Sequence, residues 1–325
     1  MNPLPLIIDT DLGLGDPGSV IDDGLAVALA LASPELEVLG LTTVNGNVGG
    51  GSAHRLSEAL LRRLGRPDIP VIAGADRPLK REMSEVWALF GQDPTERESV
   101  LDGVPSDGDA ARWLVERVAE RPGEITIAAI GPLTNIARAI HTDPAFAHNV
   151  REIVTMAGNA TGYIIPGIEV SADFNVAVDP DAFAEVLAAG IPLRAIGIDQ
   201  TSRVFLTRAD AEDLRSAAPA GSRVAWLADR IDGWLDVLAR GAFGEPGEPC
   251  LLHDPLVIAA LIRPDTCHFT PQRVSVDSTG NSLTQLPLIA SDETGPPTGR
   301  ARFAAATDTD VPGFHALFRE RLVSP

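Results

Sequence analysis

The sequence predicts an α/β fold with a doubly wound, mostly parallel central sheet and a helical C-terminal portion. Short apolar runs alternate with segments of helical periodicity through the first two hundred residues, as in chains built from βα units. Polar residues gather where the apolar runs end, and the ligands of such sheets bind at that edge. Because no repeat, low-complexity tract or clear linker interrupts the chain, we expect a single domain over residues 1–325.

The first elements show this alternation clearly. Residues 4–10 form an apolar run that ends in polar residues, which is typical of a strand buried on both faces. Residues 24–32, rich in Ala and Leu, favour a helix, and residues 36–44 favour a second strand. A helical pattern at 52–64 precedes a short apolar stretch at 70–73, which predicts a third strand.

The same pattern continues through the middle of the chain. Apolar residues with a helical period predict helices, and short apolar runs between turn signals predict strands. We expect helices at 110–119, 133–141 and 181–188, and strands at 125–130, 153–156 and 194–198.

The last third differs, because helical patterns predominate. We expect helices at 209–217, 222–239 and 310–322, and a hairpin of short strands at 274–276 and 286–289. A Gly- and Pro-rich loop at 241–249 leads into His253, Asp254 and Pro255.

The composition limits the partners and the compartment. Of the 325 residues 45% are hydrophobic, enough for a large core, and the formal net charge of −19 makes nucleic acid and anionic membranes poor partners. A small neutral or cationic ligand, or a metal ion, fits better. The two cysteines, Cys250 and Cys267, form no CxxC motif, which indicates a reducing compartment. With no basic leader and no long apolar run, we expect a soluble cytoplasmic protein.

Four acids stand at the first strand end and the following helix start. Asp9 and Asp11 end the apolar run at 4–10, and Asp22 and Asp23 begin the helical segment. Carboxylates crowded at one edge of a sheet repel one another, and a divalent cation with oxygen ligands would stabilise them. The sequence therefore predicts a metal site here.

A second pattern overlaps the first. Gly13, Gly15 and Gly18 have the GxGxxG spacing of dinucleotide-binding loops, between a strand and a helix. The acids Asp22 and Asp23 oppose this interpretation, because a pyrophosphate needs bare N–H groups at the helix start. We interpret the glycines as a flexible loop or a plain surface loop.

Six motifs in order carry a family resemblance. They are Asp9-Thr10-Asp11 with Asp22-Asp23, Thr42-Thr43-Val44-Asn45-Gly46-Asn47, the Gly-Pro-Leu-Thr-Asn-Ile-Ala turn at 131–137, Met156-Ala157-Gly158, Asp173-Phe174-Asn175 and His253-Asp254-Pro255. With these motifs the chain resembles, over nearly its whole length, the inosine–uridine-preferring nucleoside hydrolases, which are calcium-dependent N-ribohydrolases with a Rossmann-like sheet. The resemblance implies an enzyme that hydrolyses the N-glycosidic bond of a ribonucleoside or close analogue, in purine or pyrimidine salvage, as a homodimer or homotetramer.

The resemblance also implies the metal ligands. They are Asp11, Asp23, Asp254 and the backbone carbonyl of Ile130, and oxygen ligands from separate strand ends suit Ca²⁺. For the acids at the two helix starts, helix capping is the competing interpretation, and for Asp254 taken alone it is the better one. The whole set of acids favours the metal.

The remaining roles follow from the same resemblance. Asp11 would be the general base, and His253 would protonate the departing base or stack beside it. A lone histidine at a helix start is otherwise a packed or capping residue. Asp22 and Asn47 would bind the ribose hydroxyls, and Asp173 and Asn175 would hold the 5′ side of the sugar. The other expected substrate contacts are Met156, Asn159, Phe174 and Trp87.

Four departures from the family pattern affect these expectations, and the first is that Asp173 stands where the family has the longer glutamate. Asp22 lies eleven positions after Asp11 where the family has four, so a metal turn at Asp16 is an alternative to Asp11. Gly167 replaces an asparagine expected near the 5′ side. The loop at 85–92 offers Trp87 and Phe90 in place of a histidine, and a core or surface position for Trp87 is at least as plausible as stacking on a purine.

Two rival functions remain open at this stage. A non-catalytic nucleoside or sugar sensor would keep the metal pocket and bind ligand without turnover, but the presence of both Asp11 and His253 counts against it. A dinucleotide-dependent dehydrogenase would use the glycine loop, and calcium in the purified protein would weaken that interpretation.

Overall fold

The computed structural model describes residues 2–15, 20–89, 108–159, 173–240, 249–272, 274–276, 284–285 and 303–323. Its centre is an eight-stranded sheet with the order β3-β2-β1-β4-β5-β6-β12-β9. The strands are β1 (Leu4–Thr10), β2 (Leu36–Thr43), β3 (Val71–Ile72), β4 (Thr126–Ala129), β5 (Glu152–Met156), β6 (Leu193–Ile196), β9 (Cys267–Pro271) and β12 (Phe303–Thr309). All neighbours pair in parallel except β9 and β12, so the predicted doubly wound, mostly parallel sheet is confirmed.

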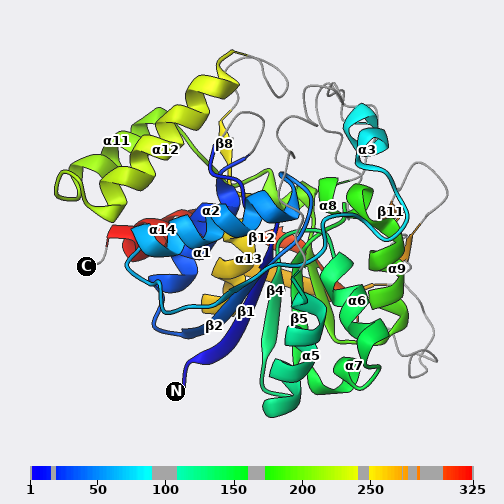
Figure 1. Ribbon diagram of the computed structural model, residues 1–325. Helices are drawn as coiled ribbons and strands as arrows, with labels where there is room; N and C mark the ends of the chain where they lie inside the picture. Colours follow the sequence, from blue (N-terminus) through cyan, green and yellow to red (C-terminus); the bar gives the residue numbers. More distant parts are fainter. Residues whose placement is uncertain are drawn as a thin grey trace.

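Helices cover both faces of this sheet (Figure 1). They are α1 (Asp22–Leu31), α2 (Gly50–Arg63), α3 (Met83–Leu89), α5 (Ala110–Glu120), α6 (Thr134–Thr142), α7 (Phe146–Asn149), α8 (Phe174–Val178), α9 (Pro180–Ala188), α10 (Ile198–Thr201), α11 (Arg208–Ser216), α12 (Arg223–Leu238), α13 (His253–Ile262) and α14 (Val311–Val323). Two small antiparallel ladders join β7 (Phe205–Leu206) to β8 (Cys250–Leu251) and β10 (Ser275–Val276) to β11 (Thr284–Gln285).

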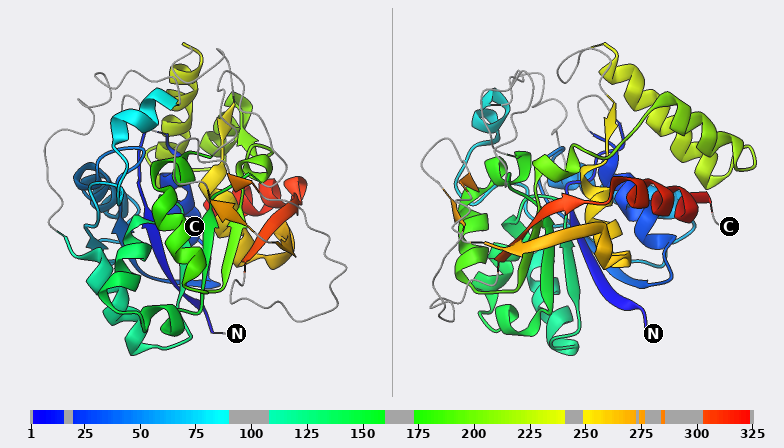
Figure 2. Two further views of the ribbon diagram at one scale, coloured as in Figure 1. Left: turned by 90° about the vertical axis from the view of Figure 1, so that its right-hand side faces the viewer. Right: turned by 180° about the vertical axis from the view of Figure 1, so that it is seen from behind.

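The core lies in two layers, one on each side of the sheet. Leu6 and Ile8 of β1 belong to the cluster formed with α1, α2, α13 and α14, whereas Ile7 belongs to the cluster with α5, α6 and α9. Successive side chains of a strand point to opposite faces, so a strand between two helix layers must be apolar throughout. This explains the continuous apolar run at residues 4–10. The α11–α12 hairpin extends away from the sheet, as the view from behind shows (Figure 2).

Helix α13 is almost wholly enclosed near the sheet edge. Every residue from 254 to 261 is buried, because α13 packs between α1 and α14 and reaches β5. A helix that is apolar on all sides has no exposed face, and its sequence lacks the periodicity that marks a surface helix. The position of Pro255 near the helix start is favourable, since proline there sacrifices no hydrogen bond.

The last third holds more sheet than its helical patterns predict. β12 pairs in parallel with β6 and antiparallel with β9, which widens the main sheet at one side. Ala304, Ala305 and Ala306 have little intrinsic preference for strands, so pairing with neighbours determines this element. The hairpin expected near 274–276 is present as β10 and β11, while residues 286–289 lie outside the described residues.

The sheet order places the topological switch point of the fold between β1 and β4. Chain connections leave the sheet in opposite directions from these two strands, and ligands of doubly wound sheets bind at such a point, beyond the carboxyl strand ends. Asp11 follows β1 and Ile130 follows β4, and the Ile130 N–H donates to the Asp9 carbonyl at 2.8 Å. Within the described residues, no helix combines the length and the apolar character needed to cross a membrane.

Candidate active site

Acids from β1, α1 and α13 meet at the carboxyl edge of the sheet. Asp22 and Asp23 open α1, and Asp254 is the second residue of α13. One carboxylate oxygen from each of these three lies within 4.8 Å of the other two, and all three side chains are buried. Asp11 adds a fourth buried carboxylate, on which the charge of Asp23 acts. The structure therefore brings together acids that are more than two hundred positions apart in the chain.

Burial and mutual repulsion both oppose the ionisation of this cluster. Burial raises the pKa of Asp11 well above its usual range, and the charge of Asp23 raises it further. Burial also raises the pKa of Asp254, with the charges of Asp22 and Asp23 acting in the same direction. Chiefly through burial, the pKa of Asp23 is raised to about 7. A cation bound among these groups would favour their charged forms and reverse the shifts.

Protein donors satisfy only part of the cluster. Asn47 donates through its backbone N–H to Asp11 Oδ2 at 2.7 Å and through its side-chain amide to Asp23 Oδ2 at 3.0 Å. The Thr10 hydroxyl donates to Asp23 Oδ1. Among the described residues, Asp11 Oδ1 and Asp22 Oδ1 are buried and have no hydrogen-bond partner. Burying a carboxylate oxygen without a hydrogen-bond donor costs free energy unless the oxygen coordinates a cation. These residues therefore fit a metal ion that takes oxygen ligands.

The turn after β2 encloses the Asp11 carboxylate. A Cβ atom at Gly46 would lie 2.0 Å from Asp11 Oδ2 and 2.8 Å from Asp11 Cγ, so only glycine leaves room for this carboxylate. Gly131, after β4, approaches the same residue, and a Cβ there would lie 2.9 Å from the Asp11 backbone nitrogen. Glycines from two turns thus allow the backbone to approach Asp11 closely, and Asn47 then donates to it.

Asn175 joins α8 to the ends of β4 and β5. Its Nδ2 donates to the carbonyl oxygens of Ile130 at 2.9 Å and of Met156 at 3.0 Å. Because a carbonyl oxygen has two lone pairs, this bond leaves Ile130 able to accept a cation as well. Three residues predicted from the sequence, Ile130, Met156 and Asn175, therefore lie in direct contact.

Asp173 is fully buried, and backbone N–H groups donate to both of its carboxylate oxygens. Its Oδ2 accepts from the Gly158 N–H at 2.6 Å, and its Oδ1 caps α8 by accepting from the Val176 N–H at 3.0 Å. Burial raises its pKa to about 6. These bonds fix Gly158 and the adjoining buried Asn159 against the start of α8. The contact of Asp173 with the 5′ side of a sugar stays a prediction.

Trp87 belongs to a small apolar cluster. The cluster comprises Met83, Val86, Trp87 and Val178, with Phe174 packed against it. Trp87 is 1% exposed, and its indole N–H is buried without a hydrogen-bond partner among the described residues. The ring is covered by protein, which favours the core interpretation over stacking on a base. Through this cluster α3 holds α8, the helix that carries Asn175.

His253 lies beside the acid cluster at the start of α13. Its Nδ1 is 2.7 Å from the hydroxyl of Thr201, and Asp22 acts on it electrostatically. Burial lowers the pKa of His253, and the Asp22 charge opposes that effect. Asp22 Oδ2 in turn accepts from the Asp254 N–H at 3.3 Å, so the His-Asp pair of α13 contacts α1 directly.

Sequence reasoning missed a layer of polar residues beneath the acids. Asp9 is fully buried, and it accepts from the Thr42 hydroxyl and from Asn135 Nδ2 at 2.8 Å. Asn135 also donates to the Thr43 carbonyl at 3.0 Å and accepts from the Ala75 N–H at 2.9 Å. The family motifs contain Asp9, Thr42 and Asn135, yet nothing in a single sequence shows that they contact one another.

Four residues named in the sequence analysis lie outside the described residues. Asp16, the rival to Asp11, lies there, as do Gly18, Phe90 and Gly167. Asp11 itself directly follows the last residue of β1 and lies near Asp23.

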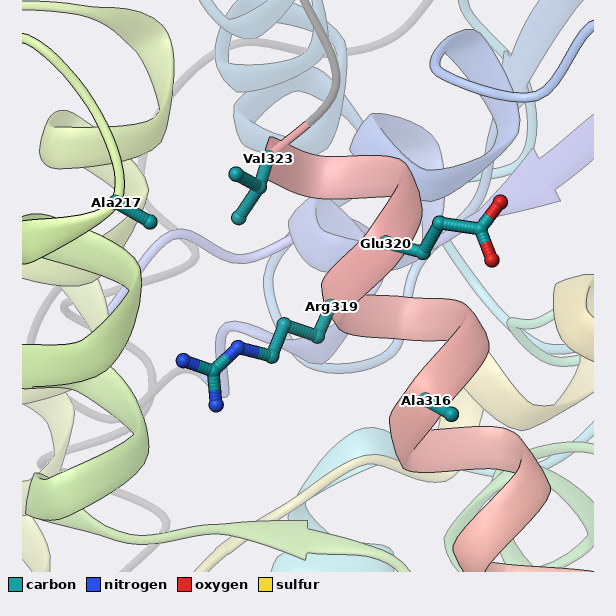
Figure 3. A pocket seen from close by; sticks show the side chains of 5 residues that line it. All are labelled: Ala217, Ala316, Arg319, Glu320 and Val323. Atoms are coloured by element: carbon teal, nitrogen blue, oxygen red, sulfur yellow. The ribbon is translucent and has the colours of Figure 1, made fainter.

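A hollow of about 470 Å³ lies on another part of the molecule, and its lining contains none of the predicted site residues. Figure 3 shows it between the end of α11 and the last turns of α14, lined by Ala217, Ala316, Arg319, Glu320 and Val323. Arg319 pairs with Asp213 at 2.8 Å. None of the clustered acids lines this hollow, and we assign it no role.

The chain was also compared with known proteins. The family model described as inosine-uridine preferring nucleoside hydrolase matches residues 6–316. Uridine nucleosidase 1 of Arabidopsis thaliana is 33% identical over 98% of this chain and 93% of its own length. The pyrimidine-specific ribonucleoside hydrolase RihA of Salmonella schwarzengrund (strain CVM19633) is 33% identical over 98% of both chains.

A solved structure agrees with these relatives. A plant nucleoside hydrolase superimposes with a TM-score of 0.78 at 30% identity, over 99% of this chain and 100% of that one. The match to the family model runs from β1 to α14, and it includes all the acids of the cluster. The chain belongs to the inosine-uridine preferring nucleoside hydrolase family.

Proposed function

We propose that this nucleoside hydrolase cleaves the N-glycosidic bond of a ribonucleoside by adding water to C1′, with Asp11 as the general base. The observation that carries this proposal is the buried Asp11 carboxylate at the carboxyl end of β1, whose Oδ1 lacks a partner among the described residues. A carboxylate that is held by Asn47 and has one oxygen available is suited to accept a proton from water.

The acids would hold a divalent cation, and we propose calcium. Asp11, Asp23, Asp254 and the carbonyl of Ile130 would be its ligands, since they offer oxygen atoms from three strand or helix termini and a backbone turn. When bound, such a cation lowers the pKa of a coordinated water and orients it. The unpartnered oxygens of the cluster support this proposal, as do the raised pKa values of its acids.

The other site residues would bind and orient the nucleoside. Asp22 and Asn47 would hold the ribose diol, because both lie against the acids that surround Asp11. On the opposite side of the crevice the contacts would come from the ends of β5 and from α8. The residues there are Met156, Asn159, Asp173, Phe174 and Asn175, with Trp87 behind them in the apolar cluster.

The reaction then needs two proton transfers. Water adds to C1′ and gives a proton to the general base, Asp11. At the same time the C1′–N bond breaks, and its electron pair goes to the departing nucleobase. His253, next to Asp22, would protonate the departing base or stack beside it. The sugar passes through a state with oxocarbenium character, and no covalent intermediate is required.

Uridine is the first substrate to assay. Relatives that share about a third of their residues with this chain are named for uridine or for pyrimidine ribonucleosides. Inosine provides the purine comparison.

The larger-scale proposals are a single domain over residues 1–325, a cytoplasmic location and a homodimer or homotetramer. The continuous eight-stranded sheet, with strands from β1 to β12, supports one domain. Cys250 and Cys267 are free and buried, as a reducing compartment allows. Light scattering coupled to size exclusion tests the oligomer.

The deciding experiment measures reducing sugar released from uridine, cytidine, inosine and adenosine by the purified protein with calcium. We expect release from at least one nucleoside, and loss of that release on chelation with recovery on added calcium. Calorimetry runs in parallel. Binding of a nucleoside without any release, with calcium bound, would contradict the proposal and support the non-catalytic sensor.

A further inference from the structure

Thr201 contacts the ring of His253, and no sequence motif pointed to it. The Thr201 hydroxyl lies 2.7 Å from His253 Nδ1, and the Thr201 side chain is fully buried. We propose that Thr201 is a positioning residue, which fixes the His253 ring so that its Nε2 meets the departing base. This inference rests on the proposed function, because it deepens the role given there to His253.

The backbone around Thr201 is tied directly to the backbone before His253. Thr201 ends α10, where its N–H donates to the Gly197 carbonyl at 3.0 Å. The chain then enters β7, which pairs with β8, and the Leu252 N–H donates to the Val204 carbonyl at 3.0 Å. Since this short ladder connects the two segments, backbone pairing places the Thr201 and His253 side chains next to each other.

A second connection attaches α10 to the main sheet. Gln200 Oε1 accepts from the Thr309 hydroxyl of β12 at 3.1 Å and from Arg203 at 3.0 Å. Both Gln200 and Thr309 are buried. The short helix that carries Thr201 is therefore held by β12 on one side and by the β7–β8 ladder on the other. The His253 ring, which contacts the Thr201 hydroxyl of this fixed helix, therefore loses rotational freedom before the substrate binds.

A hydroxyl suits this position because it both donates and accepts. It can accept from a protonated Nδ1 or donate to a bare Nδ1, so either protonation state of this nitrogen keeps the same orientation of the ring. With Nδ1 engaged, Nε2 is the ring nitrogen left for the substrate, on a ring that already interacts with Asp22.

The step that Thr201 assists is balanced in atoms and electrons. The C1′–N bond breaks with its electron pair on the base, and the base takes a proton from His253 Nε2. Water forms the new C1′–O bond and gives its proton to Asp11. Thr201 exchanges no proton with the substrate, and its hydroxyl accepts from His253 Nδ1–H throughout this step.

Two substrates separate a positioning role from a general structural one. Uridine needs a proton on its departing base, whereas 4-nitrophenyl riboside releases a stable phenolate that needs none. We expect Thr201→Val to lower kcat for uridine about 10- to 100-fold, in line with the cost of misplacing a catalytic group, and to lower it far less for the nitrophenyl riboside. Thr201→Ser keeps the hydroxyl and should restore most of the uridine rate.

Thr126→Val is the matched control. Thr126 is also fully buried, but it stands at the start of β4, and its hydroxyl has no hydrogen-bond partner among the described residues. The same substitution there should leave the ratio of the two rates unchanged. Equal loss on both substrates in Thr201→Val, or no loss on either, would overturn the positioning role.

A spectroscopic readout keeps the test independent of turnover. The ¹⁵N imidazole resonances of the free protein, assigned to His253 among the six histidines by a His253→Gln variant, report the hydrogen bond at Nδ1. We expect the Nδ1 signal to be the same in wild type and Thr201→Ser and to move in Thr201→Val. An unmoved signal would refute the contact. If the wild type releases no sugar from any nucleoside, the proposed function fails. The Nδ1 signal then still tests the contact between Thr201 and His253.

Discussion

Asp11 is the residue on which the proposed chemistry depends most. Replacing it with asparagine keeps the shape of the side chain but removes the basic oxygen and one negative charge. We expect Asp11→Asn to lower kcat for the best nucleoside by at least ~10³-fold, because a positioned general base alone contributes about that much. Steady-state kinetics measure this effect, and calorimetry with calcium should show weaker binding.

An exposed acid provides the control for Asp11. Asp68 pairs with Arg66 at 2.9 Å on the surface, and its side chain is 63% exposed. Asp68→Asn should leave both kcat and calcium affinity unchanged. An active Asp11→Asn enzyme would show that another group, with Asp16 the first candidate, is the base.

Gly46 is the second residue whose substitution should lower the activity, because it lies against Asp11. A methyl group at this position would lie 2.0 Å from Asp11 Oδ2, so the turn or the carboxylate must move in Gly46→Ala. A shift of this size displaces a catalytic group, and we expect kcat to fall about 100-fold while the far-ultraviolet circular dichroism is retained.

Gly233 is the matched glycine for this comparison. It lies inside α12, and a Cβ there meets nothing within 4 Å. Gly233→Ala should keep full activity and raise the free energy of unfolding by about 0.5–1 kcal/mol, since alanine favours a helix interior. Unchanged kinetics in Gly46→Ala would show that the turn tolerates a side chain near Asp11.

At the scale of elements, Asn135 connects the strand ends that carry the site. It bonds to Asp9 of β1, to the Thr43 carbonyl at the end of β2 and to Ala75 beyond β3. Asn135→Ala leaves these buried groups unsatisfied, so we expect the free energy of unfolding to fall by about 2–3 kcal/mol. Urea unfolding followed by circular dichroism measures the change.

Asn149, in α7, is the comparison for Asn135. It is partly exposed, so Asn149→Ala should change the free energy of unfolding by less than about 0.5 kcal/mol. Similar values for the two variants would show that the Asn135 network adds little to stability.

The elements themselves were predicted with unequal success. β1, α1, β2 and α2 lie close to the expected ranges, because the apolar run of β1 and the Ala- and Leu-rich sequence of α1 are strong local signals. β12 was not expected as a strand, since its alanines favour no strand by themselves and its pairing partners lie far away in sequence. Nor did α13 have a periodic pattern, because it is buried on every side.

At the scale of the whole molecule, the cluster couples stability to pH and to metal. The pKa of Asp23 is about 7 in the folded chain and 3.8 is its usual value, so the metal-free folded state binds more protons than the unfolded state between these pH values. The stability from this group is fully present below about pH 4 and is lost as the pH rises through 7. The raised pKa of Asp9, about 7, acts in the same direction.

Calcium should reverse this trend, because it competes with protons for the same oxygens. We expect added calcium to raise Tm little at pH 5 and markedly at pH 8, by the equivalent of about 2.7 kcal/mol at 100 times its Kd. Differential scanning calorimetry at both pH values, with and without calcium, measures the effect.

Asp254→Asn tests whether calcium raises Tm by binding to the acid cluster, since this variant removes one proposed calcium ligand. The calcium-dependent rise in Tm at pH 8 should shrink strongly in this variant. A rise that is as large at pH 5 as at pH 8 would place calcium binding outside the acid cluster.

The sequence by itself determined the fold class and the order of the strand ends. It also singled out Asp11 and Asp23 through a local signal, an apolar run that stops at acids, whereas Asp254 was recognised only through the family resemblance. Only the tertiary structure decided which residues touch. The contact between Thr201 and His253, the bonds of Asn135 and the bond from the Gly158 N–H to Asp173 all join separate segments of the chain. Such contacts depend on strand register and helix packing, which no local pattern encodes.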